Sequence, residues 1–110
     1  MPIKTDVISG TKTHKEYVTP AFTADFIIDE TMLGKTVAVA GTASVTVQIP
    51  VGLSNGFWCI VERIGLFDVT FVALLGVTLQ SAGNTLATQY TSAVVEHKGS
   101  NICKIEGRLT

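Results

Sequence analysis

Acidic side chains and histidines are the first residues to consider for chemistry. Asp25, Asp29 and Glu30 lie close together in the sequence, as paired carboxylates for acid–base catalysis or calcium ligands would. They lack the alternating ligand spacing of a calcium-binding loop, so we interpret them as the solvated end of a strand. His14 and His97 could serve as a base or a ligand, but no serine or cysteine motif accompanies either one. Both are expected to be surface histidines.

The two cysteines also lack a reactive setting. Cys59 and Cys103 form no short-spaced pair and have no histidine near enough in sequence for a zinc site. Each stands among apolar neighbours, so a free buried thiol is expected at both positions, and a disulfide would require an oxidising compartment. The glycines are scattered through turns and form no phosphate-binding loop. The sequence therefore predicts no catalytic residue, no cofactor and no metal, and we do not expect an enzyme.

The composition indicates a protein that assembles. The formal net charge of the 110 residues is -1, so no global field attracts nucleic acid or an anionic membrane. Hydrophobic residues make up 46% and charged residues 15%, against about 25% charged in an average soluble domain. This deficit favours a surface that is partly hidden in an assembly, although a Thr/Ser/Asn/Gln-coated surface is the alternative. The apolar run at residues 69–79 is far shorter than the ~20 residues that span a bilayer, so no membrane contact is expected.

Short strands joined by tight turns are the elements that must carry these residues. Residues 43–49 alternate strictly, which places Val45, Val47 and Ile49 on one buried side, and Pro50 ends the strand. About eight or nine such strands, at spacings of 8–12 residues, predict an all-β, antiparallel, jelly-roll-like β-sandwich. A single helical turn is expected around residues 29–33. The expected core comprises Val37, Val39, Val45, Val47, Ile49, Val61, Val69, Phe71, Val77, Leu79, Val94 and Ile105.

Residues 1–20 are expected to form an extended N-terminal arm, and residues 21–110 a single β-sandwich domain. The arm is polar, shows no helical period and ends at a proline. We expect it to be a docking element that orders on a partner. Its contact residues would be Ile3, Val7, Ile8, Tyr17 and Val18. The alternative is a first strand that completes the sandwich through most of these same residues.

The run at residues 57–64 is apolar on both faces, whereas one sandwich core can absorb only one of them. We expect the side with Trp58, Ile60 and Ile64 to turn outward. Glu62 lies on that side, and a charge is tolerated better at the rim of an interface than in a core. These four residues are the predicted contact between copies of the chain. The alternative is that the N-terminal segment of the same chain folds over this face.

The order of seven short motifs resembles a domain that recurs in tailed-bacteriophage structural proteins. The motifs are FIIDETMLGKTVAV, SVTVQIP, GFWCIVERIG, DVTF, GVTLQSAG, QYTSAVV and GSNICKIEGRLT. The phage domains show a similar order of features. These are a Gly-Lys turn before an alternating strand, a strand ending in Pro, an aromatic strand after Gly, a V-T-F strand, a G-V-T-L-x-S-x-G hairpin and a G-x-N strand ending in G-x-L. The resemblance covers about residues 26–110. Cys103 stands near the place where these domains often have Trp.

The resemblance implies a virion protein, assembled in the host bacterial cytoplasm and commonly trimeric. We favour a capsid decoration, or cement, protein that stabilises the particle through a homotrimer and through contacts of the arm with a major capsid or tail protein. The alternative is a tail-fibre or baseplate tip module that binds a host-surface carbohydrate or protein. A fibre normally has a long shaft or heptad stalk upstream, and this chain shows neither. A sugar site would require an exposed aromatic side chain, for which Tyr17 and Tyr90 are available whereas Trp58 lies in the most apolar strand.

Overall fold

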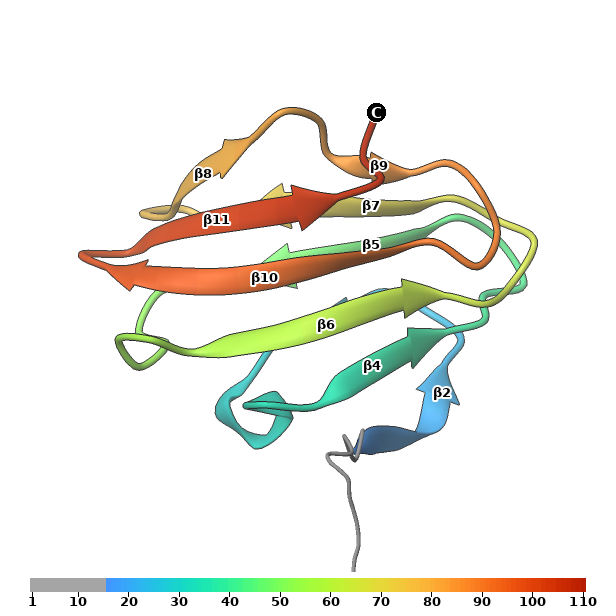
Figure 1. Ribbon diagram of the computed structural model, residues 1–110, viewed down its shortest axis with the longest axis horizontal. Coiled ribbons are helices and arrows are strands. Elements are labelled where there is room, and N and C mark those ends of the chain that lie inside the picture. The colour runs from blue at the N-terminus through green and yellow to red at the C-terminus, as the bar shows by residue number, and fades with distance from the viewer. Residues whose placement is uncertain (1–15) are drawn as a thin grey trace, which may run out of the picture.

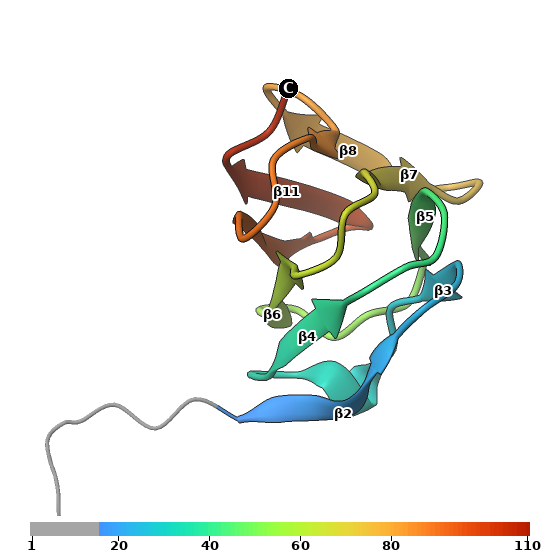
Figure 2. The ribbon, with the colours of Figure 1, turned by 90° about the vertical axis from the view of Figure 1, so that its right-hand side faces the viewer.

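The computed structural model of the protein describes residues 16–110, whose strands form two sheets that pack face to face (Figures 1 and 2). The six-stranded sheet has the order β2-β4-β6-β10-β11-β8, and the four-stranded sheet has the order β3-β5-β7-β9. The first contains β2 (Tyr17–Phe22), β4 (Thr36–Val39), β6 (Trp58–Arg63), β8 (Thr78–Ser81), β10 (Ser92–Gly99) and β11 (Ile102–Gly107). The second contains β3 (Phe26–Ile27), β5 (Val45–Ile49), β7 (Val69–Ala73) and β9 (Thr85–Leu86). A 3-10 helix, η1 (Glu30–Met32), forms the helical turn predicted around residues 29–33.

The chain winds as a coil between the two sheets. From β2 to β9 each successive strand belongs to the other sheet, so that one turn of the coil adds one strand to each layer. As a result β2, β4 and β6 are parallel in one sheet, and β3, β5 and β7 are parallel in the other. The chain then returns to the six-stranded sheet as β10 and β11, which lie antiparallel to each other between β6 and β8 (Figure 1).

The prediction of an antiparallel, jelly-roll-like sandwich is therefore wrong, although the all-β class is right. The sheets are mixed and largely parallel, in a β-solenoid arrangement. Alternation and turn residues identify strands and their ends, but a short Gly-rich link can lead either back along the same sheet or across to the other one. Here the links between β4 and β9 cross to the other sheet (Figure 2). The hairpin of β10 and β11 agrees with the antiparallel expectation.

The core lies between the two sheets. All the residues expected in the core are buried or pack against it, except Val94, which is 39% exposed. Alternation explains the agreement, since it selects one side of each strand whichever way the neighbouring strand runs. The largest further side chains that fill the core are Phe57, Ile28 and Leu86.

The hairpin between β10 and β11 turns on two residues in the left-handed region. Ser100 and Asn101 have φ values of 54° and 56°, a pair of positive φ angles that fits the twist of a tight hairpin. Asn101 also accepts a hydrogen bond from the amide of Gly52 at 3.0 Å, which ties this turn to the link after β5. The predicted turn at residues 98–101 and the C-terminal hairpin are confirmed.

The edge strands are β2 and β8 in the six-stranded sheet and β3 and β9 in the four-stranded sheet. β2 pairs with β4 only around Tyr17–Val18 and at Phe22, because a bulge that includes Pro20 interrupts the register. At the other extreme of the coil, the C-terminal residue Thr110 lies along β9, with its amide 2.9 Å from the carbonyl oxygen of Thr85. Bulges, prolines and covering segments are the devices by which sheets avoid pairing along their edges.

β2 also crosses the boundary expected between the arm and the domain. It begins before Pro20 and ends after it, so Tyr17 and Val18 belong to the six-stranded sheet. Val18 packs against the core. These two residues fit the alternative of a first strand, whereas Ile3, Val7 and Ile8 lie outside the described residues.

Candidate functional site

β6 presents its side chains as its alternation predicts. Cys59 is fully buried, whereas Trp58 is 43% exposed and Ile60 and Glu62 are half-buried on the outer face of the six-stranded sheet. Ile64 follows the end of the strand and is also half-buried. The structure thus brings three of the four predicted interface residues together on one outer surface, with the fourth at its end. Their contact with another copy stays a prediction.

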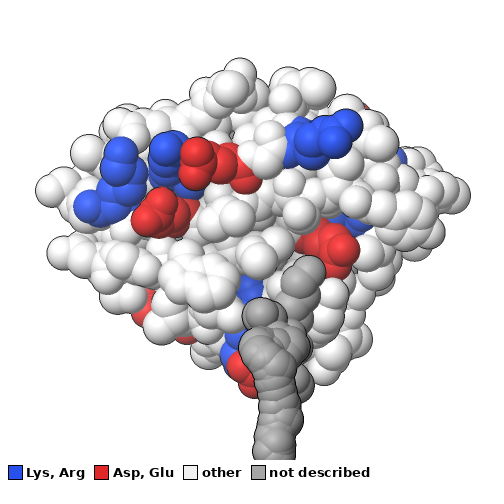
Figure 3. Space-filling view, viewed as in Figure 1, with Lys and Arg blue, Asp and Glu red and all other residues white. Residues whose placement is uncertain are grey.

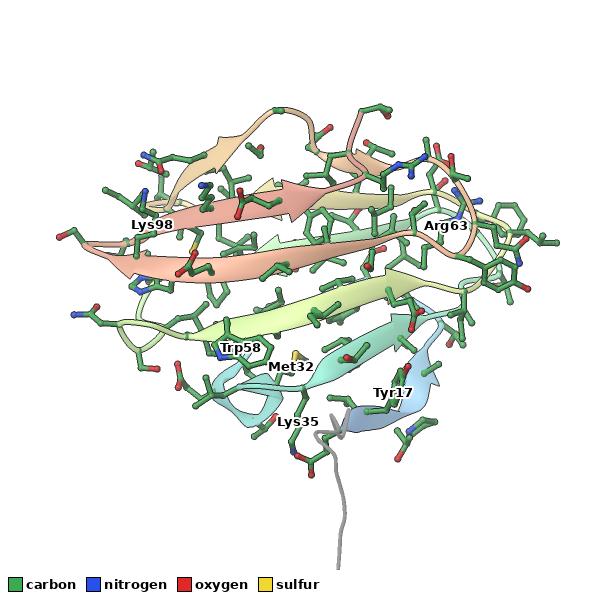
Figure 4. The ribbon with its side chains drawn as sticks, in the orientation of Figure 1. Tyr17, Met32, Lys35, Trp58, Arg63 and Lys98 are labelled. Carbon is green, nitrogen blue, oxygen red and sulfur yellow. The ribbon has the colours of Figure 1, made fainter. Side chains whose placement is uncertain are left out.

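The register of four strands extends this surface into an apolar strip. Ile60 lies opposite Thr36 of β4 on one side and opposite Val94 of β10 on the other. Thr36 in turn lies opposite Tyr17 of β2. Figure 4 shows Trp58 and Tyr17 at two ends of this part of the sheet. We call Tyr17, Trp58, Ile60 and Val94 the apolar strip.

Two short side chains of β4 share the outer face with the strip. Thr36, between Tyr17 and Ile60, is only 3% exposed, and Ala38, which lies opposite Glu62, is only 8% exposed. Val94 and Tyr17 are 39% and 45% exposed, so the strip itself is accessible. Contiguous apolar surface of this kind is a mark of an interaction site.

A glycine turn sets the position of Trp58. The amide of Gly34 donates to the carbonyl oxygen of Trp58 at 2.8 Å, and Gly34 has a φ of 74° that suits glycine. A Cβ atom at Gly34 would lie 3.8 Å from Cζ2 of the indole, so the ring lies over this turn. The end of the strip is therefore held by backbone as well as by its own strand.

Two members of the strip were not predicted as interface residues. Val94 was expected in the core, but β10 turns Ala93 and Val95 inward and Val94 outward. Three apolar residues in a row do not reveal their own orientation. The charged residues Glu96 and Lys98, which must face outward, would have shown it. Tyr17 was assigned to the arm, and its place on the strip depends on the pairing of β2 with β4.

Charged side chains border the strip and leave its centre apolar (Figure 3). Glu96 lies opposite Trp58, and Glu62 is the next outward residue after Ile60 along β6. On β11, the strand beyond β10, Lys104 forms an ion pair with Glu106, with 3.2 Å between Nζ and Oε2. An apolar centre with a polar rim is the usual anatomy of a protein–protein interface.

A buried arginine organises the end of the molecule where β6 stops. The Arg63 side chain is 6% exposed, and its Nε donates to the carbonyl oxygen of Gly65 at 3.1 Å. Its Nη1 donates to the carbonyl oxygen of Leu86 at 3.0 Å and to the carboxylate of Asp68 at 3.1 Å. The carbonyl oxygen of Arg63 accepts from the amide of Tyr90 at 2.8 Å. Arg63 thus ties the loop before β7 to the segment between β9 and β10.

Large side chains project from these two tied segments. Leu66 and Tyr90 are 74% and 73% exposed, and Phe67 is 45% exposed. Tyr90 also has a φ of 65°, which is uncommon for a residue with a side chain. We call Leu66, Phe67 and Tyr90 the end cluster. Figure 4 places Arg63, whose hydrogen bonds join the two segments that carry the cluster, at the end of the molecule away from Trp58.

The three acids considered for chemistry hold loops in place. Asp29 caps η1. Glu30 accepts hydrogen bonds from the amide of Ser54 at 2.7 Å and from its hydroxyl at 2.9 Å. Asp25 accepts from the amide of Thr46 at 2.8 Å. All three are exposed, as predicted; Asp25 and Glu30 each join two segments of the coil, whereas the contact of Asp29 is local.

His97 is buried, and the prediction of a surface histidine at this position is wrong. It is 2% exposed, and neither ring nitrogen has a hydrogen-bond partner. It faces inward because it shares the inner side of β10 with Ala93 and Val95. His14 lies outside the described residues.

The cysteines are free and buried, as the sequence predicts. Burial, together with a smaller effect of the neighbouring Cys103, raises the pKa of Cys59 to about 12. Burial also raises the pKa of Cys103. Both thiols therefore stay protonated and unreactive near neutral pH. Within residues 16–110, no three His, Cys, Asp or Glu side chains are arranged to hold a metal ion.

A shallow groove of about 390 Å³ lies where β8 separates from β11. It is lined by Gln80, Ser81, Lys104, Glu106 and Leu109, among others. Its polar groups are a hydroxyl, an amide and the ion pair described above, with no histidine or cysteine among the lining residues. This combination does not assemble a nucleophile with a base.

No helix within residues 16–110 is long and apolar enough to cross a membrane. The apolar strip and the end cluster are two surface features of the described residues that bear on function. No protein-family model, curated protein or solved structure matches the chain.

Proposed function

We propose that this protein is a structural component of a bacteriophage particle, a capsid decoration or cement protein whose copies join through the apolar strip. The observation that carries the proposal is the strip itself, in which the exposed Trp58 and Val94 and the half-buried Ile60 lie together on the outer face of the six-stranded sheet. The phage setting comes from the order of sequence motifs at residues 26–110. In this setting the protein acts in the virion, after assembly in the host bacterial cytoplasm.

The strand edges support association through a face. The bulge in β2 and the C-terminal residue along β9 interrupt strand pairing at two of the four sheet edges, which are β2, β8, β3 and β9. The outer face of the six-stranded sheet, in contrast, exposes Tyr17 on β2, Trp58 on β6 and Val94 on β10. A contact there buries side chains without disturbing any strand pairing.

Trp58 is the expected centre of the contact. Tryptophan is enriched among the residues that dominate interface energies, and such residues lie near the centre of a desolvated patch. A stable interface hides roughly 800 Å² on each partner, which requires the charged border around Glu62 and Glu96 to take part as the rim. Closed symmetry is the default for identical copies, and the resemblance favours a homotrimer. The remaining surface is then available to a major capsid or tail protein.

Two valines allow a matched test of the strip. Val94 lies on the strip and is 39% exposed, whereas Val72 lies on β7 of the four-stranded sheet and is 40% exposed. Val94→Asp places a charge in the contact and is expected to convert the oligomer into folded monomers, measured by sedimentation. Val72→Asp makes the same chemical change on the other sheet and is expected to leave the oligomer intact. A parent protein that is monomeric at micromolar concentration, or an unaffected Val94→Asp variant, contradicts the proposal.

A second candidate function is a fibre or baseplate tip module that binds a host-surface carbohydrate or protein. The end cluster favours it, because Tyr90 and Phe67 are exposed aromatic side chains on segments held rigidly by Arg63. Rigid aromatic side chains bind with a small loss of conformational entropy. Under this function, Tyr90→Ala abolishes retention of the protein on host cells and Val94→Asp does not. Under the cement function, neither substitution affects such retention.

A further inference from the structure

The strands of the four-stranded sheet carry no charge. β3, β5, β7 and β9 contain no acidic or basic residue. The strand register aligns their outward side chains in two rows, with Ile27, Gln48 and Val72 in one row and Thr46, Thr70 and Thr85 in the other. We call these six residues the neutral face.

The neutral face is open to a partner. Ile27 and Val72 are 48% and 40% exposed, and the other four residues are half-buried. β3, β5 and β7 run parallel, and parallel sheets are usually covered on both faces. Here the core covers the inner face, whereas no other strand or helix within residues 16–110 lies over the outer one (Figure 2). The type of sheet therefore indicates that another surface packs on this face.

Exposed carboxylates border the neutral face. Asp25 immediately precedes β3, and Asp29 and Glu30 come shortly after it. Asp68 immediately precedes β7 and forms an ion pair with the buried Arg63 at 3.1 Å. The other three carboxylates form no ion pair with any residue in the described range 16–110. The border is therefore negatively charged.

The other charged side chains of residues 16–110 lie on the strands of the six-stranded sheet or directly beside them, and both signs are present (Figure 3). The cations are Lys35, Lys98, Lys104 and Arg108. The acids are Glu16, Glu62, Glu96 and Glu106. This layer is therefore electrically balanced, and the excess of negative charge in the described residues belongs to the border of the neutral face.

We propose that the neutral face docks on a different protein, whose contact surface has an uncharged centre and a border of lysine or arginine side chains. The identity of this partner rests on the proposed function, under which it is the particle that the copies decorate. The neutral face then points toward the particle, and the apolar strip on the opposite layer joins the copies to one another.

The charges exclude the other candidate partners. The neutral face of a second copy would bring an identical acidic border against the first one, and the balanced six-stranded layer of a second copy offers no matching cationic border. Nucleic acids and anionic membranes would meet the carboxylates with phosphates of the same sign. A carbohydrate would require an aromatic side chain, and the neutral face contains none.

The size of the neutral face makes its border part of the contact. Four strands at about 4.8 Å each and five residues at roughly 3.3 Å each cover about 300 Å². A stable interface hides roughly 800 Å² on each partner, so the contact has to extend over the carboxylates. Cationic side chains of the partner then compensate Asp25, Asp29 and Glu30.

The test removes two border charges and keeps the hydrogen bonds that these residues accept. Asp25 accepts from the amide of Thr46 and Asp29 caps η1, and an asparagine side-chain oxygen can accept both bonds. The variant is Asp25→Asn, Asp29→Asn. The matched control is Glu16→Gln, Glu106→Gln, which removes two charges from the six-stranded layer.

The measurement is binding to particles of the phage that encodes the chain, assembled without it, over a range of salt concentrations. We expect the Asp25, Asp29 variant to bind roughly tenfold more weakly at low salt, since each exposed charge contact contributes about threefold. Its binding should also depend less on salt than that of the parent. The control is expected to bind like the parent. Val72→Asp places a charge in the centre of the neutral face and is expected to abolish particle binding while the oligomer stays intact.

Three results overturn the proposal. Equal binding of the parent, the Asp25, Asp29 variant and Val72→Asp shows that the partner docks elsewhere, and the proposed function then still stands. Loss of the oligomer in Val72→Asp shows that a second copy occupies the neutral face. A parent that binds no particle contradicts the docking and the cement function together. A monomeric parent that docks with the expected pattern contradicts only the joining of copies through the apolar strip.

Discussion

Replacement of Arg63 by methionine tests whether the buried guanidinium holds the end of the coil together. Methionine keeps an unbranched stem of similar length but removes all three hydrogen bonds that the guanidinium donates. The acceptors are the carbonyl oxygens of Gly65 and Leu86 and the carboxylate of Asp68. Arg63→Met therefore removes the polar contacts and leaves most of the apolar packing of the stem.

The three bonds contribute unequally to the free energy of unfolding. The Asp68 side chain is 52% exposed, so water can solvate its carboxylate once the guanidinium is removed. We therefore assign about 0.5 kcal/mol to the ion pair between Arg63 and Asp68. The bond to Leu86 is buried, and a buried carbonyl oxygen left without a donor costs about 1–3 kcal/mol. The bond to Gly65 is part-buried and contributes about 1 kcal/mol. We expect Arg63→Met to lower the free energy of unfolding by about 3 kcal/mol.

Urea unfolding followed by far-ultraviolet circular dichroism measures this loss. With a slope of about 1.5 kcal/mol per M, a loss of about 3 kcal/mol lowers the midpoint by roughly 2 M. The control is Lys104→Met, which removes an ion pair whose side chains are 41% and 64% exposed and is expected to cost less than about 1 kcal/mol. If the two variants lose the same stability, Arg63 is not the structural centre of this end of the molecule.

Two further predictions concern the buried titratable side chains. His97→Phe is expected to raise the free energy of unfolding by about 1 kcal/mol, because it removes two buried ring nitrogens that lack partners and keeps a ring of similar shape. A loss of stability in the same urea assay would reveal a hydrogen bond to the imidazole. For Cys59, burial raises the pKa to about 12 from an ordinary value of 9.0, so the thiol in the unfolded chain releases its proton at lower pH than the folded one. Stability is therefore complete below pH 9 and falls by about 1.4 kcal/mol per pH unit as the pH rises toward 12. Cys59→Ala should flatten this decline in urea titrations at pH 8, 10 and 11, and an unchanged slope would contradict the assignment.

The alternation of side chains was sufficient to predict which residues of most strands enter the core. Val45, Val47 and Ile49 face inward because a strand places alternate side chains on opposite sides, whatever its partner. The outward orientation of Trp58 followed from the same rule, combined with the charge at Glu62. These are local properties of the chain, so the sequence contains them.

Local patterns were ambiguous where apolar residues follow one another without interruption. In β10, Val94 lies between two buried neighbours, and the sequence alone does not show which face of the sheet it occupies. Its pairing with Ile60 of β6 places Val94 on the outer face. The same pairing turns His97 into the core. Arg63 points away from Glu62 because adjacent residues of a strand face opposite sides, but its buried acceptor, the carbonyl oxygen of Leu86, comes from a distant segment that only the folded coil brings close.

The sequence by itself therefore determined the all-β class, the positions of most strands and the inner sides of those strands whose residues alternate clearly. The tertiary structure alone decided that β2, β4 and β6 run parallel, that their outer side chains join into the strip, and that Arg63 ties two loops together. The physical reason is that a turn sequence specifies where a strand stops but not which sheet the next strand joins. That choice depends on burying the inner sides of all strands at once, which is a property of the whole chain.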